Sequence, residues 1–157
     1  MTTTQTIMAA RFPANAEEMS AVRHEVREAL AQFGLAEALI TDLVLAIGEA
    51  CMNIIQHAYS SDDKGDIVLE VECRKDGQDN TRPLLVCRMT DFARHKSCAE
   101  EMRPRPLDEI RPGGLGCHII REVMDEVVLV DKPGHLGNVL ELRKWLPGKN
   151  TQQQQVP

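Results

Sequence analysis

Three polar side chains recur at intervals of four residues in LVLAIGEACMNIIQHAY, residues 43–59. Glu49, Asn53 and His57 therefore share one face of a predicted helix whose other faces are nearly all apolar. Burying a neutral amide without a partner costs about 2–7 kcal/mol, so this stripe is expected to line a binding site. A carboxylate can accept the proton of a hydroxyl group, and an amide oxygen one turn along suits Mg²⁺.

The alternative for this stripe is a helix face that points to solvent, which is the ordinary explanation of three polar positions. The apolar side chains on the flanking turns argue against it. His57 alone is more typical of a packing or capping residue at a helix end than of a catalytic residue. The pair of Glu49 and Asn53 is therefore the more informative part of the stripe.

A second candidate is the aspartate that ends the predicted strand PLLVCRMTD, residues 83–91. Asp91 shares a face by parity with three apolar residues, namely Leu85, Cys87 and Met89. Aspartate is common at strand-terminal turns, but a carboxylate here could also accept a hydrogen bond from a ligand amine. Position alone leaves these two explanations even.

A third candidate is the glycine cluster in RPGGLGCHIIREVMDEV, residues 111–127, directly before a periodic apolar segment. Gly113, Gly114 and Gly116 could form a bare turn. They could also let backbone amides approach an anion at the start of a helix, where the helix dipole favours negative charge. The pattern is neither a P-loop nor a dinucleotide-binding fingerprint, and alone it does not decide between these two.

The elements that must position these residues follow from hydrophobic periodicity and turn signals. Asn15 and Glu18 form a predicted capping box for a helix that ends at Gly34. The apolar residues after the glycines continue at helical spacing as far as Val127. A mixed, largely antiparallel sheet with packed helices is expected. The other expected elements are strands 7–12, 66–74, 83–91, 126–132 and 138–146, a helix at about 35–58 and a long loop at 92–111.

Composition limits the classes of function. The chain has a net charge of −6 and only 3% aromatic residues, which disfavours direct binding to nucleic acid. We find no apolar stretch long enough to span a bilayer and no secretory signal at the start. Five cysteines without a CxxC pair are typical of reduced thiols in a cytoplasmic protein.

The 157 residues are expected to form one domain over residues 1–146. Residues 147–157 contain the low-complexity run TQQQQVP and are expected to form a flexible tail.

In this order, a helix with ExxxN, a strand ending in Asp, a long loop and a GGxG helix start resemble the Bergerat, or GHKL, ATP-binding fold. Within that superfamily the chain resembles the anti-sigma-factor serine/threonine-protein kinases of bacterial partner switching. The stretches IGEACMNIIQHAY and RPGGLGCHIIREVMDEV carry the resemblance, which spans residues 7–145. It implies an α+β fold, a two-layer α/β sandwich with helices on one face of a mixed, mostly antiparallel sheet.

The resemblance also implies roles. Glu49 matches the family's general base, Asn53 its Mg²⁺ ligand and Asp91 the carboxylate that reads the adenine amino group of ATP. Gly114 and Gly116 match the phosphate-side hinge of a lid formed by residues 92–112. The full set expected to bind the cofactor is Asn53, Asp91, Gly113, Gly114, Leu115, Gly116 and His57.

The implied function is phosphorylation of a STAS-type anti-sigma-factor antagonist, with a sigma factor as a second partner and a homodimer suggested by the family. One departure supports an alternative, because DFARHKS at residues 91–97 lacks the glycines that the family carries after the aspartate. The alternative is a non-catalytic module on the same fold that sequesters its partner with little or no nucleotide. An ATP hydrolase like the chaperone and topoisomerase relatives is disfavoured, since those carry further domains.

Overall fold

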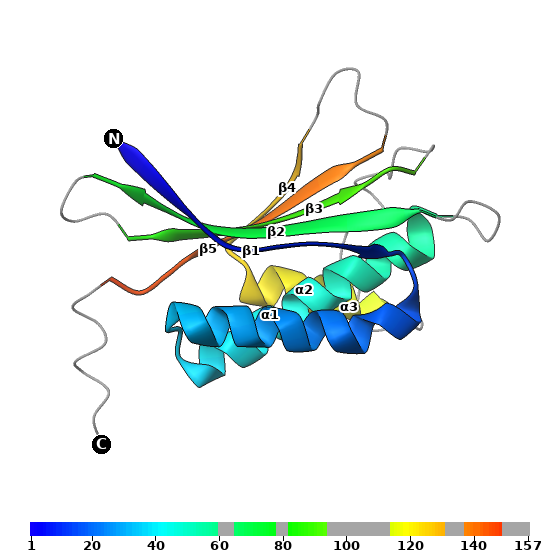
Figure 1. Cartoon of the computed structure of the whole chain (residues 1–157), viewed down its shortest axis with the longest axis horizontal. Coiled ribbons are helices and arrows are strands. Elements are labelled where there is room, and N and C mark those ends of the chain that lie inside the picture. The colour runs from blue at the N-terminus through cyan, green and yellow to red at the C-terminus, as the bar shows by residue number, and fades with distance from the viewer. Residues whose placement is uncertain (60–64, 78–81, 94–113, 131–136, 149–157) are drawn as a thin grey trace.

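The computed structural model describes residues 1–59, 65–77, 82–93, 114–130 and 137–148. They form two layers, with every described helix packed on one face of a five-stranded sheet (Figure 1). The strands are β1 (Thr2–Pro13), β2 (Asp66–Asp76), β3 (Leu84–Asp91), β4 (Glu126–Val130) and β5 (Val139–Trp145). The helices are the short 3-10 helix η1 (Ala16–Glu18), α1 (Met19–Phe33), α2 (Glu37–His57) and α3 (Gly114–Val123).

The strand order in the sheet is β1-β2-β3-β5-β4, and all four pairings among the described strands are antiparallel. The predicted α+β sandwich with helices on one face is confirmed, but the prediction of a mixed sheet is wrong. The connection that contains α3 leads from β3 to β4, and these two strands do run parallel. They do not pair, because β5 lies between them and is antiparallel to both.

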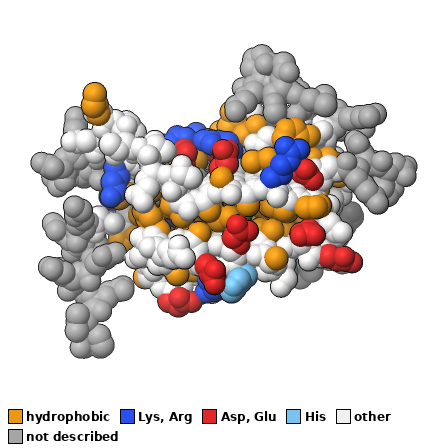
Figure 2. All heavy atoms as spheres, in the orientation of Figure 1, with side chains coloured by type: hydrophobic (Ala, Val, Ile, Leu, Met, Phe, Trp, Pro, Cys, Tyr) orange, Lys and Arg blue, Asp and Glu red, His pale blue; other side chains and the backbone are white. Residues whose placement is uncertain are grey.

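Strand alternation places one row of each strand against the helices. In β2 the buried row is Ile67, Leu69, Val71 and Cys73, and in β3 it is Leu85, Cys87, Met89 and Asp91. Apolar side chains gather along the line where the sheet meets the helices (Figure 2). Burying one such aliphatic side chain contributes about 1.5–3 kcal/mol, so this seam holds the two layers together.

Helix α2 lies between α1 and α3 and is the most buried of the three. By length and composition alone this helix could cross a membrane. The expectation that the chain has no apolar stretch long enough to span a bilayer is therefore wrong by these two criteria. However, 56% of its most apolar window is buried inside the protein, as in the core helix of a globular domain. The helix is therefore only weak evidence for a membrane span.

Several predicted boundaries need correction. Strand β1 begins at Thr2, earlier than predicted, because its threonines continue the pairing with β2. The predicted capping box is wrong: Asn15 Oδ1 accepts from the Glu17 amide at 3.1 Å and caps η1. Gly34 does end α1, with a left-handed φ of 96°. Helix α3 stops at Val123, and Val127 belongs to β4, where it pairs with Leu142.

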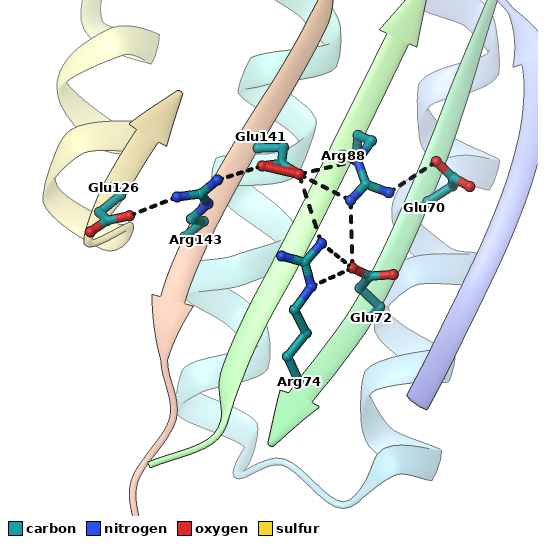
Figure 3. Close-up of polar contacts among 7 residues, drawn as sticks. All are labelled: Glu70, Glu72, Arg74, Arg88, Glu126, Glu141 and Arg143. Atoms are coloured by element: carbon teal, nitrogen blue, oxygen red, sulfur yellow. Dashed lines mark hydrogen bonds and ion pairs between the residues drawn. The ribbon is translucent and has the colours of Figure 1, made fainter. Parts of the chain in front are cut away.

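The sheet face away from the helices carries a network of ion pairs (Figure 3). At its centre Arg88 donates to Glu141 Oε1 from Nη2 at 3.0 Å and to Glu70 Oε2 from Nη1 at 3.4 Å. Glu141 is only 5% exposed, and Arg143 Nη2 donates to its second oxygen at 2.8 Å. The network comprises Glu70, Glu72, Arg74, Arg88, Glu126, Glu141 and Arg143.

Candidate functional site

Glu49 of α2 lies in close contact with Gly116 at the start of α3. A Cβ atom added to Gly116 would lie 2.6 Å from Glu49 Oε2. Glu49 is half-buried, and within the described residues its carboxylate takes part in no ion pair or hydrogen bond. The glycine therefore brings the backbone of α3 next to a carboxylate that is available to a ligand.

Asn53 lies one turn further along α2 and is only 8% exposed. Its Nδ2 atom donates to Cys117 Sγ at 3.7 Å, again across the contact between α2 and α3. Among the described residues this is the only hydrogen bond of the Asn53 side chain. The Oδ1 atom therefore has no partner there, and it is not fully buried. The oxygen of a largely buried amide thus remains accessible.

Asp91 ends β3 on the helix-facing side and is 1% exposed. Within the described ranges its Oδ1 atom accepts from the amide of Ala93 at 3.1 Å and from both the backbone and the side-chain nitrogen of Asn138 at 3.2 Å each. Three N–H donors on one oxygen stabilise the ionised carboxylate and fix its orientation.

The turn before β5 makes these contacts to Asp91 possible. Gly137 has a φ of 102°, and a Cβ atom there would lie 2.1 Å from the Asp91 carbonyl oxygen. Only glycine combines that left-handed backbone with so close an approach. The turn therefore sets Asn138 directly beside the end of β3, where its carbonyl also accepts from the Asp91 amide at 2.9 Å.

Tyr59, two residues after the end of α2, links that helix to the ends of β2 and β3. Its hydroxyl donates to the Asp66 carbonyl at 2.7 Å and accepts from the Phe92 amide at 2.8 Å. Gly65 lies against the ring, since a Cβ atom there would be 2.5 Å from Tyr59 Cε1. The helix that carries Asn53 and the strand that ends in Asp91 are thus joined through one phenol group.

The predicted residues separate into three groups. Glu49 and Asn53 meet α3, and Asp91 is buried at the end of β3, where the Tyr59 contact links it to α2. Gly114 and Leu115 are the first two residues of α3, whereas His57 is exposed at the last position of α2. Gly113 and the predicted lid beyond Ala93 lie outside the described residues, as does the tail from residue 149.

The glycine-free stretch after Asp91 is described only in its first part. Ala93 takes the first position where the family carries glycine. It is buried, and its amide contacts Asp91. No non-glycine residue in the described ranges has a positive φ, so this position does not require glycine for its backbone.

Sequence reasoning missed Cys117, Gly137, Asn138 and Tyr59. The sequence PGHLG, residues 133–137, is typical of a turn and carried a signal for Gly137. Cys117 had a weaker signal, because it lies three residues before the apolar Ile120 and therefore shares a helix face with it. No local sequence signal pointed to Asn138 as the partner of Asp91, since the two residues lie 47 positions apart.

The four described cysteines are free, as expected for reduced thiols. Burial raises the pKa of the Cys51 and Cys87 thiols to about 12, which makes both unreactive at neutral pH. Cys117 differs from these two because it faces Asn53.

The donor set fits Mg²⁺ held jointly with a nucleotide. No group of three or more His, Cys, Asp or Glu side chains that could hold a metal occurs among the described residues. Mg²⁺ is usually bound through one or two protein oxygens together with phosphate oxygens and water. The accessible Oδ1 of Asn53 is a protein oxygen of this kind, next to the helix start that carries Gly116.

Comparison with known proteins identifies the family. The model of the histidine kinase-like ATPase domain matches residues 12–144, so the chain belongs to that family. Membership implies that it binds ATP.

Among its relatives the chain is similar to the Serine-protein kinase RsbW of Bacillus velezensis, with 27% identity over 95% of this chain and 91% of that protein. It is 26% identical to the Bacillus subtilis protein of the same name over 88% and 85%, and 29% identical to that of Staphylococcus aureus over 79% of each chain. The predicted likeness to bacterial serine kinases is therefore confirmed.

A solved structure supports the fold. The RsbU and RsbW domains of Rv1364c from Mycobacterium tuberculosis superpose with a TM-score of 0.57 at 21% identity, covering 90% of this chain and 34% of that longer chain. The predicted ATP-binding fold is confirmed by this match together with the family model.

Proposed function

We propose that this protein is an Mg²⁺- and ATP-dependent serine/threonine kinase that phosphorylates a STAS-type anti-sigma-factor antagonist and binds a sigma factor. The observation that carries the proposal is the contact between α2 and α3, where Glu49 meets Gly116 and Asn53 meets Cys117. A carboxylate without an ion-pair partner and an accessible amide oxygen lie beside a glycine-rich helix start. That set suits the transfer of a phosphoryl group.

In the proposed reaction, the Glu49 carboxylate accepts the proton of the serine or threonine hydroxyl of the antagonist. The hydroxyl oxygen forms a bond to the γ-phosphorus of ATP as the bond to the β-phosphate oxygen breaks, which leaves ADP. Mg²⁺, when bound, neutralises charge on the phosphate oxygens. The role of Asn53 Oδ1 is to hold that ion in place.

The other residues bind the nucleotide in this proposal. Asp91 accepts a hydrogen bond from the adenine amino group, with its carboxylate oriented by Asn138. Gly113, Gly114, Leu115 and Gly116 lie on the phosphate side, where their backbone amides and the N-terminus of α3 favour an anion. His57, exposed at the end of the same helix face, stays a predicted member of the set. We also propose a cytoplasmic location and a homodimer, the latter testable by light scattering.

The direct test is to incubate the protein with Mg-ATP and its cognate antagonist and to map phosphorylated residues by mass spectrometry. We expect one phosphoserine or phosphothreonine in the antagonist, and none when EDTA removes the Mg²⁺. An antagonist that stays unmodified while the kinase is saturated with ATP would remove the kinase proposal.

The second candidate is a module on the same fold that sequesters its partner without catalysis. The stretch DFARHKS favours it, because it lacks the glycines found in the family. Calorimetry with ATP and Mg²⁺ separates the two candidates: no heat of binding favours the module, and measurable binding favours the kinase.

A further inference from the structure

We propose that Cys117 is a positioning residue that sets the orientation of the Asn53 amide. The thiol sulfur accepts from Asn53 Nδ2 at 3.7 Å, so the nitrogen end of the amide points to α3. The oxygen end is then turned away from the thiol, and in the proposed function it is the atom that holds the cation. This role rests on the proposed function of Asn53 but concerns a different residue.

An asparagine amide needs such a partner. Its oxygen and nitrogen ends have nearly the same shape, so packing alone does not distinguish the two orientations, and only hydrogen bonding does. In the flipped orientation Nδ2, a donor, would face the cation. At 8% exposure, solvent offers this side chain little compensation, and even a weak sulfur acceptor biases the amide.

Gly116, the residue before Cys117, brings the thiol close enough to accept a hydrogen bond from Asn53. Gly116 lets α3 approach Glu49 of α2, with 2.6 Å between a hypothetical Cβ atom and Oε2. The next residue of α3 is Cys117, and it meets the next turn of α2 at Asn53. Neighbouring positions on α3 thus serve neighbouring polar residues on α2, the first by close approach and the second by hydrogen bonding.

A purely structural role for Cys117 makes a different prediction. Valine is close to cysteine in size and has no acceptor, whereas serine is slightly smaller and keeps one. If Cys117 only fills space, Cys117→Val should preserve the site better than Cys117→Ser. If it positions Asn53, the order is reversed.

The first measurement uses the protein without nucleotide. NMR follows solvent exchange of the Asn53 side-chain NH₂ protons, whose signal is identified by its loss in Asn53→Asp. We expect exchange about fivefold faster in Cys117→Val than in the wild type, and near wild-type exchange in Cys117→Ser. Equal exchange in the wild type and Cys117→Val would overturn the proposal.

The second measurement is the factor by which Mg²⁺ strengthens ATP binding, taken from calorimetry with Mg²⁺ and with EDTA. We expect Cys117→Val to reduce that factor about fivefold or more while ATP binding in EDTA stays unchanged, and Cys117→Ser to restore it. An unchanged factor in Cys117→Val would contradict the positioning role. Cys73→Val, at a cysteine in β2, is the matched control and should change neither measurement.

The two measurements separate this inference from the proposed function. If the wild type binds no Mg-ATP, the proposed function fails, and the NH₂ exchange still decides whether Cys117 holds Asn53. If the wild type binds Mg-ATP normally and the exchange is the same in all variants, the positioning role fails alone.

Discussion

Two groups of polar residues lie on opposite sides of the sheet and are treated in opposite ways. On the open face every carboxylate of the network meets an arginine, and Glu141 meets three. In the contact between α2 and α3, Glu49 has no ion-pair partner within the described residues and Asn53 has one weak hydrogen bond. The open face therefore has more charged groups than the contact between α2 and α3, although the proposed function lies in that contact.

The difference indicates that paired and unpaired polar groups have different roles in this protein. Cross-strand charges such as Arg88 opposite Glu70 and Glu141 satisfy one another and fix the register of neighbouring strands. The side-chain oxygens of Glu49 and Asn53 have no hydrogen-bond partner among the described residues. A residue that is half-buried and unpaired is therefore the better candidate for chemistry, and substitutions on the two sides should have separable effects.

The largest effect is expected for Glu49→Gln. Because an amide cannot accept the hydroxyl proton, phosphotransfer should fall about 100-fold or more. The affinity for ATP and the melting temperature should stay near their wild-type values, since Glu49 holds no ion pair among the described residues. Single-turnover phosphotransfer and calorimetry measure the two quantities. Joint loss of binding and transfer would make Glu49 a structural residue.

On the open face, Arg88→Met should act on stability alone. The Arg88 side chain is 19% exposed, and its removal leaves Glu70, Glu72 and Glu141 close together without their shared cation. We expect a loss of about 2 kcal/mol in the free energy of unfolding, measured by urea denaturation. ATP affinity should not change.

The matched control for this variant is Arg27→Met. Arg27 pairs with Glu37 at 2.6 Å on the surface, and both side chains are exposed. Such a pair contributes about 0–1 kcal/mol, so the loss should be smaller than for Arg88. Equal losses in the two variants would contradict the view that the network stabilises the sheet more than an isolated surface pair does.

The smallest effect concerns pH. Burial by itself would raise the pKa of Glu141, but hydrogen bonds and charge from Arg143 and Arg88 outweigh it and lower the pKa below its ordinary value. A lowered pKa in the folded state means that the carboxylate stabilises the protein above its unfolded-state pKa, about 4.3. That stability is lost as pH falls through the folded-state pKa.

Comparison of the wild type with Glu141→Gln isolates this contribution. The difference in their melting temperatures should be largest near pH 6 and should shrink as the pH is lowered below about 4. A difference that stays constant over this range would show that Glu141 does not stabilise the protein through its charge.

Local patterns predicted much of this molecule. The periodic stripe placed Glu49 and Asn53 on one helix face, and strand parity placed Asp91 on the buried side of β3. Both patterns depend only on the repeat of a helix or a strand. The predicted extension of the last helix from Val123 to Val127 was wrong for a related reason, because apolar residues of β4 continue the helical spacing.

The contacts that complete the site were not predictable from local patterns. Cys117 meets Asn53 across 64 residues and Asn138 meets Asp91 across 47. The arginine and glutamate pairs on the open face likewise required the strand order β2-β3-β5-β4, which periodicity does not give. Sequence reasoning proposed the candidate site residues, and the fold showed which residues contact them.

The hydroxyl of Tyr59 has a wider consequence. It is donor to one strand end and acceptor from another, so a single oxygen atom joins three separate segments of the chain. The spacing between the proposed base-binding and metal-binding ends of the nucleotide site is therefore held in part by one aromatic side chain. A phenylalanine at this position would keep the ring but remove both of these hydrogen bonds.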